Sequence, residues 1–390
     1  MDSLITPKTL FEVSDMKICR ILIMAILCLL LSGCSLYEGN YVSVEPHQKQ
    51  SSNTHTEAIP ADNYTQLVDV LESMVESGVP SGVINITNYN FDAAERNMTA
   101  AIRLIRELFP IGAYAVEDIT YEIGTNTGRP AIAVEITYRH SSIEIQKIRK
   151  LRTMDDANRA IGEALRDFDT ALVMRIDEYV ETDFIQTVQH YASRYPELVM
   201  EIPQVVVNVY GGSASKVVEI TFTYQSNRDA LRMMRAQVEP VFNSAVLYVS
   251  GEGAARQKYE QLYGFLMERF DYTVETSITP AYSLLRHGVG DSRAFAQVYS
   301  AMCRQAGLDC QMVTGTRNGE PWTWNIIHSD ENYYHVDLLR CHNIGGFMEF
   351  TDADMLGYVW DYSAHPATYP GAPQIQEPAV PEQVDAEKTE

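Results

Sequence analysis

The sequence predicts an α+β protein in which two tandem α/β repeat modules with antiparallel sheets precede a third α+β domain. Three features support this prediction: short segments alternate apolar and polar residues, helical stretches separate them, and one order of helices and strands occurs twice. With 390 residues, 46% of them hydrophobic, the chain is long enough for two or three domains and can form their cores.

The chain is strongly acidic. It carries 52 acidic against 30 basic residues, a formal net charge of -22. A charge of this sign and size repels phosphate backbones and anionic lipid surfaces. We therefore expect no nucleic-acid partner.

The N-terminal segment has the order of a secretory signal. Lys17 and Arg20 follow Met16 and precede an apolar run from Ile21 to Leu31. The run has too few residues to span a bilayer as a permanent helix. The first 15 residues fit no signal architecture, so Met16 is an alternative start.

The apolar run leads into the motif LSGC, whose last two residues are Gly33 and Cys34. This sequence resembles a bacterial lipobox. The resemblance implies lipid on Cys34 and an extracytoplasmic protein anchored through that lipid to the cell membrane. The alternative is an ordinary signal peptide with a chance cysteine.

Composition divides the rest of the chain. After a signal at 1–33, residues 34–61 are polar and lack periodicity, which predicts a flexible tether after the lipidated cysteine. Residues 366–390 are rich in proline and glutamate, which predicts a disordered tail. The two repeat modules are expected at 62–152 and 153–242, and the third domain at 243–365.

Each repeat module is expected to contain a helix, a strand, a helix, two strands and a final helix, in that order. These elements are predicted at 64–78, 82–89, 93–110, 115–123, 131–139 and 142–151 in the first copy, and at 157–168, 171–179, 184–196, 199–210, 216–224 and 228–237 in the second. VEITY at 134–138 matches VEITF at 218–222, and the glycines of 210–216 predict a hairpin turn. Neither copy groups histidines, cysteines or carboxylates at catalytic spacing, so we predict spacers or binding modules.

The third domain begins with an amphipathic helical segment at 255–275. A second helix follows Ser292, because apolar residues recur there every three or four positions, and Gly307 is placed to end it. The buried stripe consists of Phe295, Val298, Met302 and Ala306. Three strands are then predicted, at 310–316, 318–327 and 332–339.

Five short motifs occur in order in this domain: AYSLLRHGVGDS ending at Ser292, CRQAGL, MVTGT, WTWN beginning at Trp322, and YYHVD ending at Asp337. With their spacing, residues 243–365 resemble the transglutaminase-like, papain-related domain. The resemblance implies an α+β domain of the papain-like kind. It also implies acyl transfer by a cysteine at the helix start, a histidine base and an aspartate that orients the histidine.

Carried over by position, the nucleophile is replaced by Ser292, the histidine by Trp322, and the aspartate is kept as Asp337. A serine hydroxyl attacks only when a base takes its proton, and an indole has no basic nitrogen. These replacements predict a catalytically degenerate site and a pseudoenzyme.

Two alternatives apply to the same residues. His335 is two positions before Asp337 and could rebuild a serine-dependent peptidase or acyltransferase, with His287 and His328 as more distant candidates. Alternatively, Ser292 and the preceding Asp291 cap the helix without any reaction.

Trp322 also has two interpretations. It fills the former cleft as core, or it forms a groove with Trp324 and His335 that binds a peptide or a glycan. Trp322 and Trp324 are two positions apart, which places them on one face of a regular strand.

Three cysteines remain after Cys34, namely Cys303, Cys310 and Cys341, so at most one internal disulfide can form, and we expect buried thiols instead. Their spacing with His342 is not that of a zinc site, and we expect neither a metal nor a cofactor. The sequence therefore predicts a membrane-anchored envelope protein that binds or scaffolds, with a peptide, a cell-wall polymer or another protein as its partner.

Overall fold

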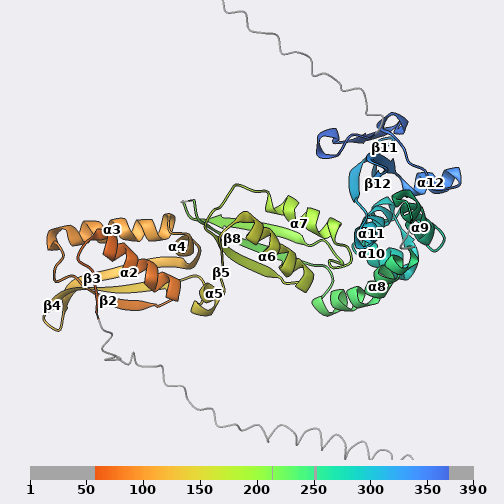
Figure 1. Cartoon of the computed structure of the whole chain (residues 1–390). Helices are drawn as coiled ribbons and strands as arrows, with labels where there is room; N and C mark the ends of the chain where they lie inside the picture. Colours follow the sequence, from red (N-terminus) through yellow and green to blue (C-terminus); the bar gives the residue numbers. More distant parts are fainter. Residues whose placement is uncertain (1–57, 213, 250–252, 369–390) are drawn as a thin grey trace, which may run out of the picture. The chain divides into compact units, whose positions relative to one another are not determined.

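The computed structural model describes residues 58–212, 214–249 and 253–368 (Figure 1). The predicted signal, Cys34, most of the tether and most of the tail lie outside these ranges. The described chain is a mixed α+β structure with three four-stranded sheets and one two-stranded sheet. No helix within the described ranges is long and apolar enough to cross a bilayer.

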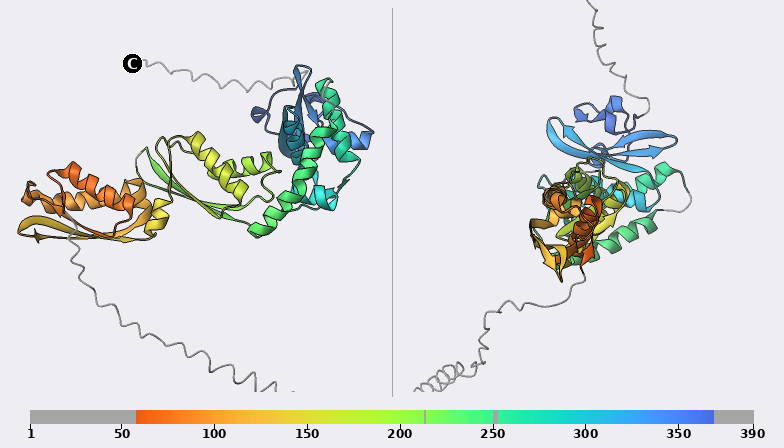
Figure 2. Two further views of the ribbon diagram at one scale, coloured as in Figure 1. Left: turned by 60° about the horizontal axis from the view of Figure 1, so that its bottom comes forward. Right: turned by 90° about the vertical axis from the view of Figure 1, so that its left-hand side faces the viewer.

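The first domain, residues 58–148, contains a sheet with the strand order β1-β2-β4-β3. Helices from the segments between the strands lie on one face of this sheet (Figure 2). The strands are β1 (Ile59–Pro60), β2 (Ser81–Asn85), β3 (Val116–Asn126) and β4 (Arg129–Tyr138), and the helices are α2 (Tyr64–Ser77), α3 (Phe91–Glu107), α4 (Pro110–Ala115) and α5 (Ser142–Gln146).

The start of this domain differs from the expected tether over 34–61. Ile59 pairs with Ile84 in a parallel ladder, and Ala61 is fully buried. A strand of two residues is too short to show an alternating pattern in the sequence. It forms because it pairs with β2, more than 20 residues further along the chain.

The second domain, residues 149–227, has the strand order β5-β6-β8-β7, with the same parallel and antiparallel pairings as the first sheet. The expected hairpin is present, since β7 and β8 are antiparallel neighbours joined through Gly211, whose φ is 95°. The elements are β5 (Arg149–Leu151), α6 (Met154–Asp167), β6 (Ala171–Ile176), α7 (Phe184–Arg194), β7 (Gln204–Tyr210) and β8 (Lys216–Thr223).

The helix predicted over 142–151 is wrong in its second half. Helix α5 ends at Gln146, and Arg149–Leu151 forms β5, which pairs with β6 of the second sheet. The boundary therefore falls near 148 instead of 152. The cause is again a short strand whose pairing decides its conformation.

The third domain, residues 228–368, packs α11 against a sheet of order β13-β12-β11-β14. Its helices are α8 (Arg228–Tyr248), α9 (Ala255–Met267), α10 (Pro280–Tyr282), α11 (Ser292–Gln305) and α12 (Leu338–Ile344). Its strands are β9 (Asp271–Tyr272), β10 (Val289–Gly290), β11 (Cys310–Arg317), β12 (Glu320–Ser329), β13 (Asn332–Val336) and β14 (Tyr358–Trp360).

Helix α8 belongs to the third domain, although the sequence assigned 228–237 to the second. Leu231, Val238 and Phe242 are buried in one core with Tyr259 of α9 and Phe295 of α11. The domain therefore begins near 228, because the apolar face of α8 packs on α9, α10 and α11.

The helix after Ser292 is confirmed. Phe295, Val298 and Met302 are buried, Ala306 is half-buried, and Gly307 ends the helix with a φ of 74°. The predicted tail also begins later than 366, because the side chain of Thr368 is buried and donates a hydrogen bond to Asp352.

Candidate functional site: the start of helix α11 and two neighbouring strands

Helix α11 begins beside the sheet. The Asp291 carboxylate caps it by accepting a hydrogen bond from the Ala294 amide at 2.8 Å. Ser292 is the first residue of the helix and is buried. Its Oγ accepts a hydrogen bond from the backbone amide of Thr323 in β12 at 3.3 Å. Asp291 therefore provides the cap, while the Ser292 hydroxyl faces the sheet.

Strand β12 places Trp322 against Asp337, which follows β13. The indole Nε1 donates a hydrogen bond to Asp337 Oδ2 at 2.8 Å. The ring is half-buried and has neighbours on its exposed side: the Arg317 guanidinium is 5.1 Å from the ring centre, and the Tyr272 ring centre is 5.8 Å away. Trp322 thus contacts the buried carboxylate of Asp337 through its Nε1 and contacts Arg317 and Tyr272 through its ring.

The Asp337 carboxylate is buried and caps α12. Its Oδ1 accepts hydrogen bonds from the amides of Leu339 and Arg340, both at 3.1 Å. The sequence predicted a strand over 332–339, whereas β13 ends at Val336, because Asp337 serves as this cap.

Two further side chains reach Asp337 Oδ2. The Tyr358 hydroxyl donates at 2.6 Å, and the Arg317 guanidinium lies at 3.6 Å. Burial, and next the neighbouring Asp337 charge, raise the pKa of Tyr358, so its phenol stays protonated and remains a donor.

The space between Ser292 and Asp337 is closed. The hollow that these residues line together with Phe295 and Thr323 is too small for a water molecule. The amide of Asn325 also lines it, with Nδ2 bonded to the Ala296 carbonyl at 3.0 Å and Oδ1 buried without a hydrogen-bond partner in the described chain. An acyl substrate has no room there unless side chains move.

His335 takes part in a separate network. Its Nδ1 accepts a hydrogen bond from Trp324 Nε1 at 2.9 Å, and its Nε2 lies 2.8 Å from Asp352 Oδ1. An indole nitrogen can only donate, so the imidazole carries its proton on Nε2. Burial lowers the pKa of His335, an effect that the bond to Asp352 partly offsets, and both ring nitrogens are already engaged.

This placement corrects the groove expected from Trp322, Trp324 and His335. Trp324 is 1% exposed and His335 is 0% exposed, so neither offers a surface to a ligand. Trp324 packs edge-on against Tyr358 and Trp360. Of the three, Trp322 alone reaches solvent, because the two tryptophans have different neighbours despite their spacing.

The other two histidines considered as candidate bases, His287 and His328, lie elsewhere in the third domain. His287 is exposed and packs edge-on against Tyr282, and His328 is exposed beside Tyr333. Within the described ranges, Ser292 has no hydrogen bond to a histidine. The structure therefore brings Trp322 and Asp337 together and places Ser292 beside them without an imidazole.

The three cysteines are free thiols. Cys303 and Cys341 are buried, and Cys310 is half-buried. Burial raises the pKa of Cys303 and raises that of Cys341 to about 12. The described part of the chain contains no group of three or more metal-ligating side chains.

Sequence reasoning missed Tyr272, Arg317 and Tyr358. Tyr272 precedes the helix by 20 residues, and Tyr358 follows Asp337 by 21. None of the three lies within a recognisable motif. Strand pairing brings Tyr358 close, because β14 pairs with β11 so that Arg317 is opposite Tyr358.

Helix α11 therefore starts beside β12, and the buried carboxylate of Asp337 directly follows the neighbouring strand β13. Residues 244–345 match the family model of the transglutaminase-like superfamily, so this part of the chain is a transglutaminase-like domain. No curated protein matches the chain.

Three solved structures are similar at low identity. A TGase has 9% identity and a TM-score of 0.24, with 55% of this chain and 63% of that chain covered. A chain assigned as a cysteine protease from Cytophaga hutchinsonii has 12% identity and a TM-score of 0.25, with 40% and 70% covered. A chain assigned as a protease from Parabacteroides distasonis has 11% identity and a TM-score of 0.22, with 42% and 39% covered. This chain thus spans less than two thirds of the TGase chain.

Proposed function

We propose that this chain is an exported, lipid-anchored envelope protein whose transglutaminase-like domain binds a partner and performs no acyl transfer. One observation carries the proposal: at the position that the family's histidine would occupy, the indole of Trp322 donates a hydrogen bond to Asp337 Oδ2, at 2.8 Å. In the family mechanism that a match to this superfamily implies, an imidazole makes this contact.

The chemistry of the replaced groups supports the loss of activity. A catalytic aspartate orients a histidine that accepts the nucleophile's proton, whereas an indole offers one N–H and accepts none. Ser292 Oγ already receives a hydrogen bond from the Thr323 amide, and no imidazole contacts it in the described structure. Removing members of a catalytic triad causes overlapping losses, so replacing both groups removes nearly the whole rate advantage.

The surface beside the closed hollow supports a binding role. Tyr272 is 44% exposed and lies against Trp322, and Arg317 covers the Trp322 ring. Tyrosine, tryptophan and arginine are enriched among the residues that contribute most to protein interfaces. This surface is the contact site that we assign to a peptide, a cell-wall polymer or a protein partner.

The first two domains are proposed to be copies of one module. Their sheets share strand order and pairing direction, and the matching segments VEITY and VEITF lie in β4 and β8 respectively. As spacers or binding modules, they would separate the third domain from the lipid on Cys34.

An activity assay on the full chain tests the proposal. Purified protein is assayed for amine incorporation, peptide hydrolysis and labelling by serine- and thiol-directed probes. We expect background rates for the wild type and for Ser292→Ala, with Ser363→Ala, a change at an exposed serine, as control. Turnover that Ser292→Ala abolishes would establish the competing serine-dependent enzyme and overturn the proposal.

A further inference from the structure

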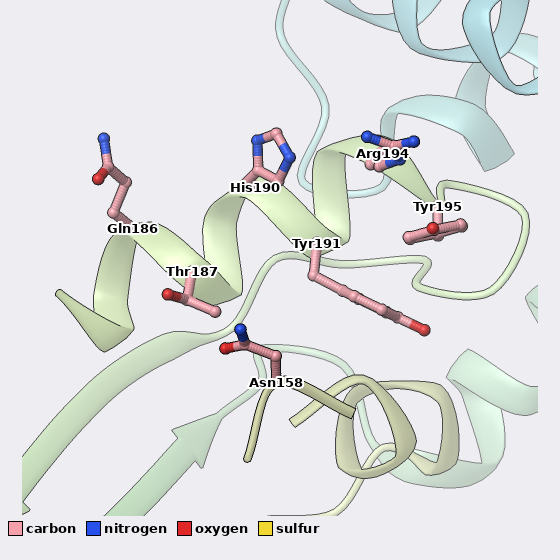
Figure 3. Close-up of a pocket in the computed structure, with 7 residues that line it drawn as sticks. All are labelled: Asn158, Gln186, Thr187, His190, Tyr191, Arg194 and Tyr195. Atoms are coloured by element: carbon pink, nitrogen blue, oxygen red, sulfur yellow. The ribbon is translucent and has the colours of Figure 1, made fainter. Parts of the chain in front are cut away.

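The second domain carries a groove of about 660 Å³ that is lined by residues of helices α6 and α7 (Figure 3). Asn158 of α6 lines one side of it. Residues of α7 and the position after it line the rest, namely Gln186, Thr187, His190, Tyr191, Arg194 and Tyr195. The groove is separate from the site around Ser292, and the function proposed above makes no use of it.

Two aromatic rings form part of the groove. The ring centres of Tyr191 and Tyr195 are 4.6 Å apart, with their planes inclined by 40°. Gly162 of α6 allows the Tyr191 ring to lie close to that helix, because a Cβ at position 162 would be 2.6 Å from the ring atom Cε2. The absence of a side chain at Gly162 therefore sets the depth of the groove.

The polar side chains of the groove are available to a ligand. Within the described ranges, the amides of Asn158 and Gln186 and the imidazole of His190 form no hydrogen bond, and the guanidinium of Arg194 forms neither a hydrogen bond nor an ion pair. Burial raises the pKa of Tyr191, which keeps its hydroxyl neutral and able to donate. The guanidiniums of Arg304 and Arg194 lie over the Tyr195 ring, at 4.6 Å and 5.9 Å from its centre, so the ring that the groove offers to a ligand is that of Tyr191.

The charge of the lining is opposite to that of the chain. It contains the Arg194 guanidinium and no carboxylate, whereas the chain has 52 acidic against 30 basic residues. The nearby Glu197 is paired with Arg304 at 2.6 Å. The local field therefore favours a negatively charged ligand group.

From these features we infer that the groove binds a saccharide that carries a carboxylate. Sugar rings present apolar C–H faces to aromatic rings and hydroxyl or amide groups to side-chain amides, which matches Tyr191, Asn158 and Gln186. Arg194 pairs with the carboxylate, since a guanidinium binds a carboxylate in bidentate geometry. A peptide strand fits less well, because a groove between helices offers no free strand edge for backbone pairing.

Calorimetric titration of the full chain, purified in mild detergent, tests this inference. The two probes are N-acetylglucosaminyl-N-acetylmuramic acid, which has a carboxylate, and diacetylchitobiose, its neutral counterpart. We expect the acidic disaccharide to bind at least about tenfold more tightly than the neutral one. This is the gain in affinity that one charge-assisted hydrogen-bonded pair provides. Arg194→Gln should remove this preference, whereas Gln189→Ala, an exposed change on α7 outside the lining, should leave both affinities unchanged.

A second variant tests the groove itself without removing a polar group. Gly162→Ala should push the Tyr191 ring into the groove and weaken binding of both disaccharides, while the better helix propensity of alanine preserves α6. Circular dichroism checks the fold of each variant. The inference is overturned if the acidic disaccharide does not bind, if both probes bind equally, or if Arg194→Gln, a change at an exposed position, binds like the wild type.

Discussion

The indole Nε1 of Trp322 donates a hydrogen bond to Asp337 Oδ2 at 2.8 Å, and this contact connects β12 to the residue that caps α12. The Asp337 Oδ2 atom thereby accepts a hydrogen bond from Trp322 as well as one from the Tyr358 hydroxyl. The contact supplies a hydrogen-bond donor to a buried carboxylate. An indole has no basic nitrogen, so Trp322 cannot accept a proton from a neighbouring group.

Ser292→Cys combined with Trp322→His should restore thiol reactivity. A thiol at the start of α11 lies in the positive potential of the helix terminus, and a histidine at 322 would replace the indole beside Asp337. Alkylation of the introduced thiol by iodoacetamide at pH 7 should proceed about tenfold faster in the double variant than in Ser292→Cys alone, because the pKa of the thiol falls. Equal alkylation rates in the two variants would show that a histidine at position 322 does not interact with the thiol at position 292.

Tyr358→Phe should destabilise the third domain. The change removes the hydroxyl that donates to Asp337 Oδ2 at 2.6 Å and leaves a buried carboxylate with one donor fewer. The expected loss in the free energy of unfolding is about 1–3 kcal/mol, measured by urea denaturation. Tyr333→Phe is the matched control, because the Tyr333 hydroxyl has no hydrogen bond within the described ranges, and equal effects of the two changes would contradict the assigned role.

Stability should fall as the pH decreases below 6.5. Burial lowers the pKa of His335 from its ordinary 6.5, so below that value the unfolded chain binds a proton that the folded chain does not. The contribution of His335 is therefore present above pH 6.5 and is lost as the pH falls toward the lowered pKa, with a slope of at most about 1.4 kcal/mol per pH unit.

Urea denaturation between pH 7.5 and 5.5 measures that slope, and His335→Gln should reduce it. His365, whose pKa burial also lowers, contributes in the same direction and accounts for a remaining slope. His328→Gln changes an exposed histidine and serves as control. An unchanged slope in His335→Gln would exclude His335 as its source.

Native alkylation should distinguish the three thiols. Cys303 and Cys341 are buried, and burial raises the pKa of both, to about 12 for Cys341. Iodoacetamide at pH 8 should therefore modify neither in the folded protein and both after denaturation, whereas Cys310 is half-buried and should react first. Peptide mass spectrometry identifies the modified sites, and rapid native labelling of Cys341 would contradict its burial.

Cys34→Ser should release the protein from the membrane fraction. The residues that precede Cys34 resemble a lipobox, and a serine cannot carry the thioether-linked lipid. Fractionation of expressing cells, followed by immunoblotting, measures the distribution. Retention of Cys34→Ser in the membrane would indicate an anchor other than lipid on this residue.

Local patterns predicted the long elements of the fold. The stripe Phe295, Val298 and Met302 indicated α11, and glycine at 307 indicated its end. The short strands β1 and β5 were missed and α8 was assigned to the wrong domain, because each depends on a partner distant in the sequence. Periodicity identifies an apolar face but does not identify what covers it.

The sequence by itself determined which chemical groups stand at the site: a hydroxyl at 292, an indole at 322 and a carboxylate at 337. The tertiary structure alone decided their partners. Pairing of β11 with β14 places Arg317 opposite Tyr358, which reaches Asp337, and packing around Trp324 encloses His335. Side-chain identity is local information, whereas burial and hydrogen-bond partners arise from strands that pair across long stretches of chain.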